Sequence, residues 1–318
     1  MGKYITWPLK DLQLVRDYGL KAPELKNSGK SVLQITDQGK DYALKLVTCS
    51  ERKLHYFQEV LRFITDSEFN NYPKVLLSVQ GKPYVQTSTG SYILSEWLPG
   101  RAADFTSYDD IIFCAKTLGQ LHKTTMGYLP AENNWEERWK SGLKQYKQLK
   151  LSLRQYPEEV RQLMTQVIKS GQRTLALLRN KQIYDILGQP AVLCHQALYE
   201  KNFLIAEDNT SYLLGLCTAR ADMPQRDVAQ FLRNVLIANN GDINLALKLI
   251  AAYCHENPFS FGDLGAVIAF MYFPRSLWSQ VDRLKSNNPE ILSKAVKAIR
   301  EDLALQPAVH NLAMVLGY

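Results

Sequence analysis

Three residues near the start of the chain have the types that hold phosphate in a P-loop. Gly29, Lys30 and Ser31 match the Gly-Lys-Ser end of that motif, in which backbone N–H groups and the lysine bind phosphate oxygens. The motif also needs a glycine five residues earlier and a buried strand upstream, but that position is Glu24 and the residues before the triplet include several charges. We therefore interpret this segment as the polar start of a hairpin.

A lysine, a histidine and an asparagine further along form a second candidate for phosphate chemistry. Lys45 follows Tyr42 and Leu44 on a predicted strand, a position that suits either a phosphate clamp or a surface lysine on a half-exposed sheet. His195 and Asn202 stand seven residues apart in a later extended segment. We expect a structural role for this histidine, because no second His or Cys stands at metal spacing beyond the adjacent Cys194. Whether Lys45, His195 and Asn202 can act together depends on the strands and helices that position them.

The elements that must position these residues fall into two groups. Apolar alternation predicts a hairpin over 30–47 and strands at 74–79, 83–86 and 92–97, and apolar residues three and four apart predict a helix over 51–64. After the turn at Leu98-Pro99-Gly100 the periodic segments are mostly helical: 111–122, 135–155, 158–187, 226–239, 244–255, 263–273 and 289–305, interrupted by an extended island at 192–205 and 211–216. The sequence therefore predicts a sheet-rich lobe over residues 1–97 and a helical lobe over residues 98–318.

Length and composition agree with two lobes. A chain of 318 residues exceeds what one hydrophobic core usually covers, and 46% hydrophobic with 22% charged residues is typical of a soluble globular protein. The longest apolar run, 264–273, has ten residues, half of what a membrane-spanning helix needs, so we expect no membrane partner. Five scattered cysteines without a C-x-x-C pair argue against a disulfide framework and a zinc site, and indicate synthesis in a reducing, intracellular compartment.

The order of these residues resembles the protein-kinase and aminoglycoside-phosphotransferase superfamily. There, a strand lysine contacts nucleotide phosphates and pairs with a helix glutamate, and the catalytic loop has the form His-x-Asp-x-x-x-x-Asn. Lys45 takes the lysine position, His195 and Asn202 have the loop spacing, and Glu96-Trp97-Leu98 resembles the hinge that receives adenine. The resemblance implies a two-lobed, α+β, protein-kinase-like fold with ATP as the possible nucleotide.

The resemblance also implies which residues would form the nucleotide site. They are Lys45, Glu59, Glu96 and Leu98, with Lys45 as a phosphate clamp or in a residual ion pair with Glu59. Glu51 is a rival to Glu59 as the partner of the lysine, and the sequence leaves that choice open.

Two further segments narrow the resemblance to the CotS group of bacterial spore coat proteins. They are Phe273-Pro274-Arg275-Ser276-Leu277-Trp278 and the stretch from Ala219 to Asp227. Membership of that group implies synthesis in the cytoplasm of the mother cell, a place in the spore coat, and other coat proteins as partners.

The working carboxylates of the superfamily are missing from this chain. Ala197 stands where the family has the Asp that accepts the proton of the attacking hydroxyl, and a positioned base contributes about a hundredfold to ten-thousandfold in rate. Gly215 stands at the metal-binding Asp and Cys217 at the second acidic position, so neither offers the oxygen ligand that magnesium prefers. We therefore expect no metal site and no catalytic residue. Cys217 suits either a reactive thiol or an inert, buried one.

Three residues of the loop motifs are retained. His195 and Asp227 resemble the positions that brace the catalytic loop, and we expect Asn202 to cap the loop rather than bind a metal. The sequence thus favours a pseudokinase with a structural or interaction role in the spore coat. The alternative is a phosphotransferase of altered mechanism that uses ATP and a sugar or amino alcohol, with a site rewired around nearby acids: Glu200, Asp208 and Asp222.

A basic helical insert over residues 138–181 accounts for the formal charge of +7. It holds eleven Lys or Arg and two acids, a net charge of +9, which leaves −2 for the rest of the chain. Five cations run beside an apolar stripe on one predicted helix: Lys140, Lys144, Lys147, Lys150 and Arg154. This face is either solvated or docks an anionic partner, and by resemblance the insert helps form the acceptor side of the cleft. A nucleic-acid or anionic-polymer binder ranks last, because the tract lacks a known recognition motif.

Overall fold

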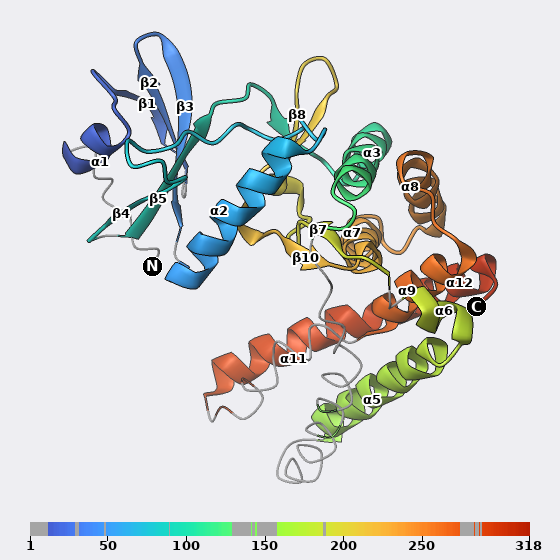
Figure 1. Ribbon diagram of the computed structural model, residues 1–318. Coiled ribbons are helices and arrows are strands. Elements are labelled where there is room, and N and C mark those ends of the chain that lie inside the picture. Colours follow the sequence, from blue (N-terminus) through green and yellow to red (C-terminus); the bar gives the residue numbers. More distant parts are fainter. Residues whose placement is uncertain are drawn as a thin grey trace. The chain divides into compact units, whose positions relative to one another are not determined.

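The structure is a computed structural model of the chain (Figure 1). It describes residues 12–28, 32–47, 49–88, 90–128, 158–186, 189–273 and 288–318, together with the single residues 141, 144, 283 and 286. The chain divides into two compact units. The N-terminal unit lies within residues 1–103 and 200–220, and the helical unit lies within residues 104–199 and 221–318.

An antiparallel sheet of five strands dominates the N-terminal unit, in the order β1-β2-β3-β5-β4. Its strands are β1 (Glu24–Ser28), β2 (Val32–Asp37), β3 (Lys40–Val47), β4 (Val85–Thr87) and β5 (Gly90–Glu96). Gln38 and Gly39 join β2 to β3, both with positive φ, as a two-residue hairpin turn requires. The predicted hairpin is confirmed, whereas the strand predicted at 74–79 is wrong: there the structure has a single bridge, from Val75 to Ser95.

Helix α2 (Glu51–Asp66) accompanies this sheet, and a short helix α1 (Leu12–Asp17) precedes it (Figure 1). The apolar stripe predicted for α2 is the face that this helix buries. Its residues are Leu54, Phe57, Val60, Leu61 and Ile64. Spacing of three and four residues puts such side chains on one side of a helix, which makes the pattern readable from sequence.

A smaller sheet completes the N-terminal unit with segments that are distant in sequence. Its order is β6 (Arg101–Ala102), β8 (Phe203–Ile205) and β9 (Ser211–Leu213), flanked by the 3₁₀ turns η2 (Glu200–Asn202) and η3 (Leu216–Thr218). This division differs from the single boundary expected at Leu98, because β6 pairs with β8 and the Ala103 N–H donates to the Phe203 carbonyl at 3.0 Å. Residues 200–220 therefore belong with the first hundred residues.

The helical unit consists mainly of helices around a short two-stranded sheet of β7 (Val192–Cys194) and β10 (Arg220–Asp222), the latter beginning at the unit boundary. Its helices are α3 (Tyr108–Thr124), α5 (Glu158–Leu178), α6 (Lys181–Ile186), α7 (Pro224–Ala238), α8 (Ile243–Glu256), α9 (Phe261–Tyr272), α11 (Pro289–Ala304) and α12 (Gln306–Leu316). Apart from residues 141 and 144, which are helical, the predicted helix at 135–155 lies outside the described residues. The predicted α+β architecture, with a sheet at the N-terminal end and helices after it, is confirmed.

Two helix boundaries differ from the sequence prediction. The single helix predicted over 158–187 is wrong, because it breaks after α5, where the Asn180 side chain accepts the Gln182 N–H at 2.9 Å and starts α6. The chain also forms α12 beyond the last predicted helix. Pro307 lies in the first turn of α12, where its missing N–H breaks no hydrogen bond within the helix. In the described part of the chain, no helix is both long and apolar enough to cross a membrane.

Candidate functional site

Residues from three segments of the N-terminal unit meet at Gly215. A Cβ placed on this glycine would lie 3.3 Å from the Lys45 Nζ and 3.9 Å from the Asn202 Oδ1. Lys45 comes from β3, Asn202 from η2, and Gly215 from the start of η3. An ammonium and an amide oxygen therefore flank the Cβ position of residue 215, where the resemblance to the superfamily expects a metal-binding carboxylate. The positive charge of Lys45 disfavours a divalent cation at this point.

Main-chain hydrogen bonds hold Gly215 in place. The Leu214 N–H donates to the Asn202 carbonyl at 2.8 Å, and the Thr218 N–H donates to the Gly215 carbonyl at 3.2 Å. Gly215 has φ +82°, a conformation that glycine adopts without steric cost. The left-handed backbone at this position therefore suits glycine.

Neither candidate glutamate pairs with Lys45 in the described residues. The Glu59 side chain is 54% exposed, and its carboxylate lies 4.0 Å from the His55 Nε2 one turn earlier. Glu51 is exposed in the first turn of α2. The expected ion pair between Lys45 and Glu59 is therefore not formed, because Glu59 lies off the buried stripe of its helix.

The hinge candidates lie at the end of β5. The Glu96 N–H donates to the Lys74 carbonyl at 2.9 Å, and its carboxylate accepts the Lys74 N–H at 3.3 Å. Leu98 is half-buried. Their part in holding a nucleotide stays a prediction.

Asp227 organises the loop of the helical unit that carries His195. Its carboxylate accepts the backbone N–H of His195 at 2.5 Å and that of Gln196 at 3.0 Å. Asp227 lies in the first turn of α7 and is buried. Ala197 follows within the same loop, so the loop is braced at its start and carries a methyl group at the position where the resemblance expects a base.

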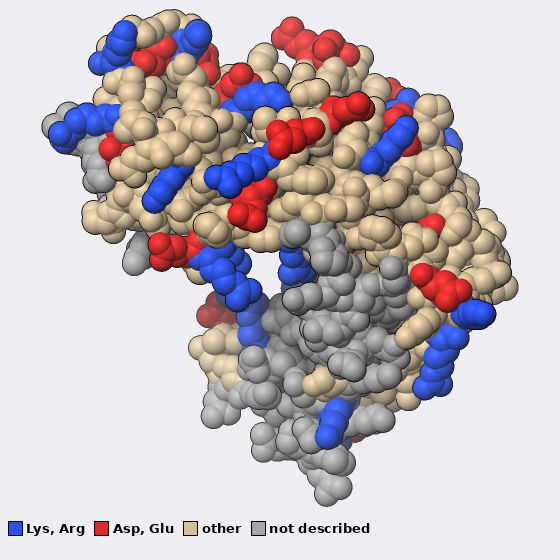
Figure 2. Space-filling model, viewed as in Figure 1, with Lys and Arg blue, Asp and Glu red and all other residues tan. Residues whose placement is uncertain are grey.

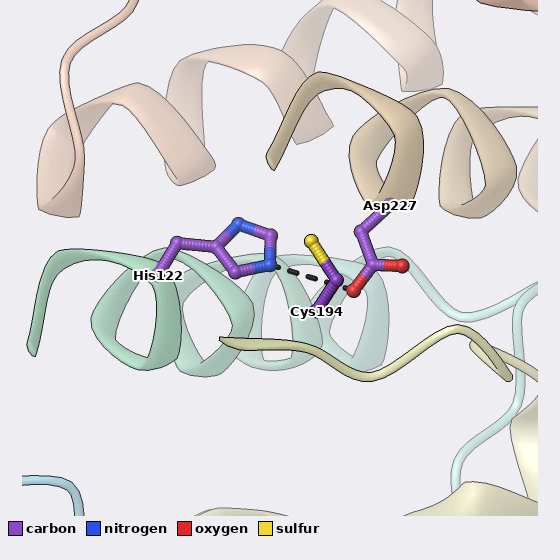
Figure 3. Close-up of side chains that lie close together, drawn as sticks. All are labelled: His122, Cys194 and Asp227. Atoms are coloured by element: carbon purple, nitrogen blue, oxygen red, sulfur yellow. Dashed lines mark hydrogen bonds and ion pairs between the residues drawn. The ribbon is translucent and has the colours of Figure 1, made fainter. Parts of the chain in front are cut away.

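Asp227 belongs to a trio of buried side chains that lie close together (Figure 3). His122 from α3, Cys194 from β7 and Asp227 from α7 point toward one another, with one ligand atom of each within 4.8 Å of the others. The His122 Nε2 lies 3.4 Å from the Asp227 Oδ2, and its Nδ1 lies 2.8 Å from the Tyr253 hydroxyl, which accepts the Asn257 side-chain N–H. These residue types also bind zinc, but the carboxylate already accepts two backbone hydrogen bonds, so we interpret the trio as a structural brace.

Sequence reasoning missed two members of the trio. The sequence places His122 only at the end of the predicted helix 111–122, and Cys194 only beside His195. A signal was present in the apolar helix face that contains this one histidine, since a buried imidazole needs hydrogen-bond partners.

The Asp227 carboxylate is ionised in the interior. Burial raises its pKa, but the hydrogen bond and charge of His122, the charge of His195 and the Gln196 N–H together hold the pKa below the ordinary value of 3.8. Stability from this group is therefore present at neutral pH and lost as the pH falls through the lower, folded-state pKa.

The acids considered as replacements for the missing base include two that are held by local contacts. The Asp222 Oδ2 lies 2.7 Å from the Arg226 guanidinium, and it also accepts the Gln196 side-chain N–H at 3.3 Å. Asp208 accepts the Thr210 N–H at 2.9 Å, and that hydrogen bond holds the pKa of the exposed carboxyl low. Glu200 is exposed in η2. Both aspartates thus already accept hydrogen bonds from other residues.

Gln196 has a left-handed backbone with φ +66°, which is costly for a residue with a Cβ. We expect Gln196→Gly to raise the free energy of unfolding by up to about 1 kcal/mol, because relief of this strain exceeds the loss of the long hydrogen bond to Asp222. Urea denaturation measures the change. Asn209→Gly, at φ +64° in an exposed turn, is the matched control and should gain less, since Asn tolerates this conformation. A less stable Gln196→Gly would show that the side-chain bond outweighs the strain.

Most of the proposed basic face lies outside the described residues. Lys140, Lys147, Lys150 and Arg154 belong to that part, whereas Lys144 is described as an exposed helical residue. Figure 2 shows acidic and basic side chains interspersed over the described surface on the face in view. Whether the row of cations docks an anion stays a prediction.

Comparison with known proteins identifies the family. The model of the phosphotransferase enzyme family matches residues 20–266. The chain belongs to this family. The kinase-like fold expected from Lys45 and from the spacing of His195 and Asn202 is thereby confirmed.

Several solved structures share the fold over nearly the whole chain. An aminoglycoside phosphotransferase from Alicyclobacillus acidocaldarius subsp. acidocaldarius DSM 446 is 19% identical with a TM-score of 0.79, covering 99% of this chain and 98% of that one. The amicoumacin kinase hAmiN, solved with AMP-PNP, Ca²⁺ and Ami, is 17% identical with a TM-score of 0.63 and coverages of 96% and 97%. A microcompartment-associated aminopropanol kinase is 14% identical with a TM-score of 0.64 and the same coverages. At these identities the likeness establishes the fold.

Proposed function

We propose that this member of the phosphotransferase enzyme family is a pseudokinase that has lost metal-dependent phosphoryl transfer. The observation that carries the proposal is the environment of Gly215, where the Lys45 ammonium lies 3.3 Å from the Cβ position that a metal-binding carboxylate would need. Phosphoryl transfer relies on bound cations to neutralise the charge that develops on the phosphate. Lys45 supplies one fixed positive charge beside Gly215, and Gly215 has no side chain that could bind such a cation.

The base position supports the same conclusion. Ala197 offers no proton acceptor, and Asp222 and Asp208 are engaged in their own hydrogen bonds. The retained frame, by contrast, includes the Asp227 brace and the Lys45 ammonium. This combination fits a protein that keeps the shape of a kinase and an anion-binding lysine while lacking turnover.

Thermal unfolding with ATP, in the presence and absence of magnesium, tests the proposal. A ligand that binds the folded state raises its stability, by about 2.7 kcal/mol at about one hundred times its Kd. We expect ATP to raise the Tm equally with and without magnesium, with no release of phosphate. Lys45→Met should abolish the rise, whereas Lys53→Met, on the exposed start of α2, should leave it intact. A magnesium-dependent rise accompanied by ATP turnover would contradict the proposal.

The second candidate is a phosphotransferase of altered mechanism that acts on a sugar or amino alcohol. The fold shared with the aminopropanol kinase over 96% of the chain favours it. It requires ATP turnover that depends on the acceptor, so the same assay with a panel of amino alcohols and sugars separates it from the pseudokinase.

A role in the bacterial spore coat is part of the proposal and rests on the resemblance of two segments to the CotS group. One contains the brace residue Asp227, and the other begins at Phe273, at the end of the described part of that region. The partners would then be other coat proteins, and synthesis would take place in the mother cell. Immunolocalisation in sporulating cells of the source organism is the direct measurement.

A further inference from the structure

Two thiols from distant parts of the sequence lie in the N-terminal unit beside the Gly215 site. Cys49 lies between β3 and α2, two residues before the helix begins, and Cys217 is the middle residue of η3. Helix α2 and η3 contact each other, which brings the two segments together. Both cysteines are free thiols of intermediate exposure.

Cys49 lies two residues before α2, and α2 contacts the η3 turn that carries Cys217. Burial raises the pKa of the Cys49 thiol, the neighbouring Cys217 raises it further, and Lys53 opposes both effects. The other three cysteines differ: Cys114 and Cys194 are buried in the helical unit, and Cys254 lies on α8. Among the described cysteines, this pair therefore combines proximity with access to solvent.

We propose that Cys49 and Cys217 form a dithiol that oxidises to an intramolecular disulfide. With glutathione disulfide as oxidant, the thiolate of one cysteine attacks a glutathione sulfur and releases one reduced glutathione. The second protein thiolate then attacks the mixed disulfide, forms the Cys49–Cys217 bond and releases the second glutathione. The protein loses two thiol protons and two electrons, and the glutathione disulfide takes up both.

The bridge would control the site next to it. Cys49 follows the strand that carries Lys45, and Cys217 stands two residues after Gly215. A disulfide would fasten these two segments to each other and fix the spacing between the lysine and the glycine. The proposal does not depend on whether the site binds a nucleotide.

Peptide mapping of the full chain after incubation with glutathione disulfide tests the bond. Trypsin cleaves after Lys45, Arg52, Lys201 and Arg220, so the two cysteines fall in peptides 46–52 and 202–220. We expect a non-reducing digest to contain these two peptides joined, and dithiothreitol to separate them. The oxidised protein should unfold about 5 °C higher than the reduced one, because the bond closes a long loop in the unfolded chain.

Single variants supply the controls. Cys49→Ser and Cys217→Ser should each lose the joined peptides and the shift in Tm, whereas Cys254→Ser, at a half-buried thiol of the helical unit, should keep both. Separate glutathione adducts on 46–52 and 202–220 without the joined form would overturn the proposal. So would a bond from either cysteine to a different one.

Discussion

Asp227→Asn is expected to lower the free energy of unfolding by about 3 to 5 kcal/mol, because it takes the charged acceptor away from two backbone N–H groups in the interior. The carboxylate accepts two backbone N–H groups from the loop of His195 and also contacts the His122 ring at 3.4 Å. An amide keeps the size but loses the charge and turns one acceptor into a donor facing those N–H groups. Urea denaturation at neutral pH measures the loss.

The pH dependence of the free energy of unfolding provides a second measurement of the contribution of Asp227. Because the pKa of Asp227 is lowered on folding, its contribution is present above the ordinary value of 3.8 and is lost as the pH falls through the folded-state pKa. The difference in stability between wild type and Asp227→Asn should therefore be constant near neutral pH and shrink below about 3.8.

An exposed aspartate that also accepts a backbone N–H is the control for this prediction. Asp208 does so from Thr210, and Asp208→Asn should change stability far less, since solvent screens its charge. A loss of under about 1 kcal/mol in Asp227→Asn would show that the buried carboxylate contributes no more than an ordinary neutral hydrogen bond.

Returning a carboxylate to position 215 should create a response to magnesium that the wild-type chain lacks. In Gly215→Asp the new side chain starts 3.3 Å from the Lys45 Nζ, the flexible end of a long side chain, and beside the Asn202 Oδ1. The left-handed backbone costs about 1 kcal/mol, less for Asp than for most residues. We expect ATP to raise the Tm of this variant more with magnesium than without it.

The double variant extends the test to chemistry. Adding Ala197→Asp supplies the base, which should raise ATP turnover about a hundredfold to ten-thousandfold over Gly215→Asp alone. Gly215→Asn is the matched control, because it has the same shape and tolerates the same backbone but carries no charge, and it should show no magnesium response. If Gly215→Asp behaves like Gly215→Asn, the retained frame no longer supports a metal site.

The sequence was sufficient for much of the local structure and for the residue types at the positions of the family motifs. The hairpin of β2 and β3 and the buried stripe of α2 follow from alternation and from spacing of three and four residues, which depend on neighbours along the chain. The absence of acids at Ala197 and Gly215 is a matter of residue type and needs no coordinates. The break between α5 and α6 was missed, because the Asn180 cap competes with helix propensity that continues on both sides.

The tertiary structure decided which distant residues meet. Pairing of β6 with β8 brings residues 200–220 into the N-terminal unit, where Gly215 lies against Lys45 and η3 contacts α2. The exposure of Glu59 and the meeting of His122, Cys194 and Asp227 likewise depend on which face each helix buries. The contacts join segments that are distant in the sequence, and the exposure of Glu59 depends on what packs against its helix, so neither alternation nor spacing along a single sequence encodes them.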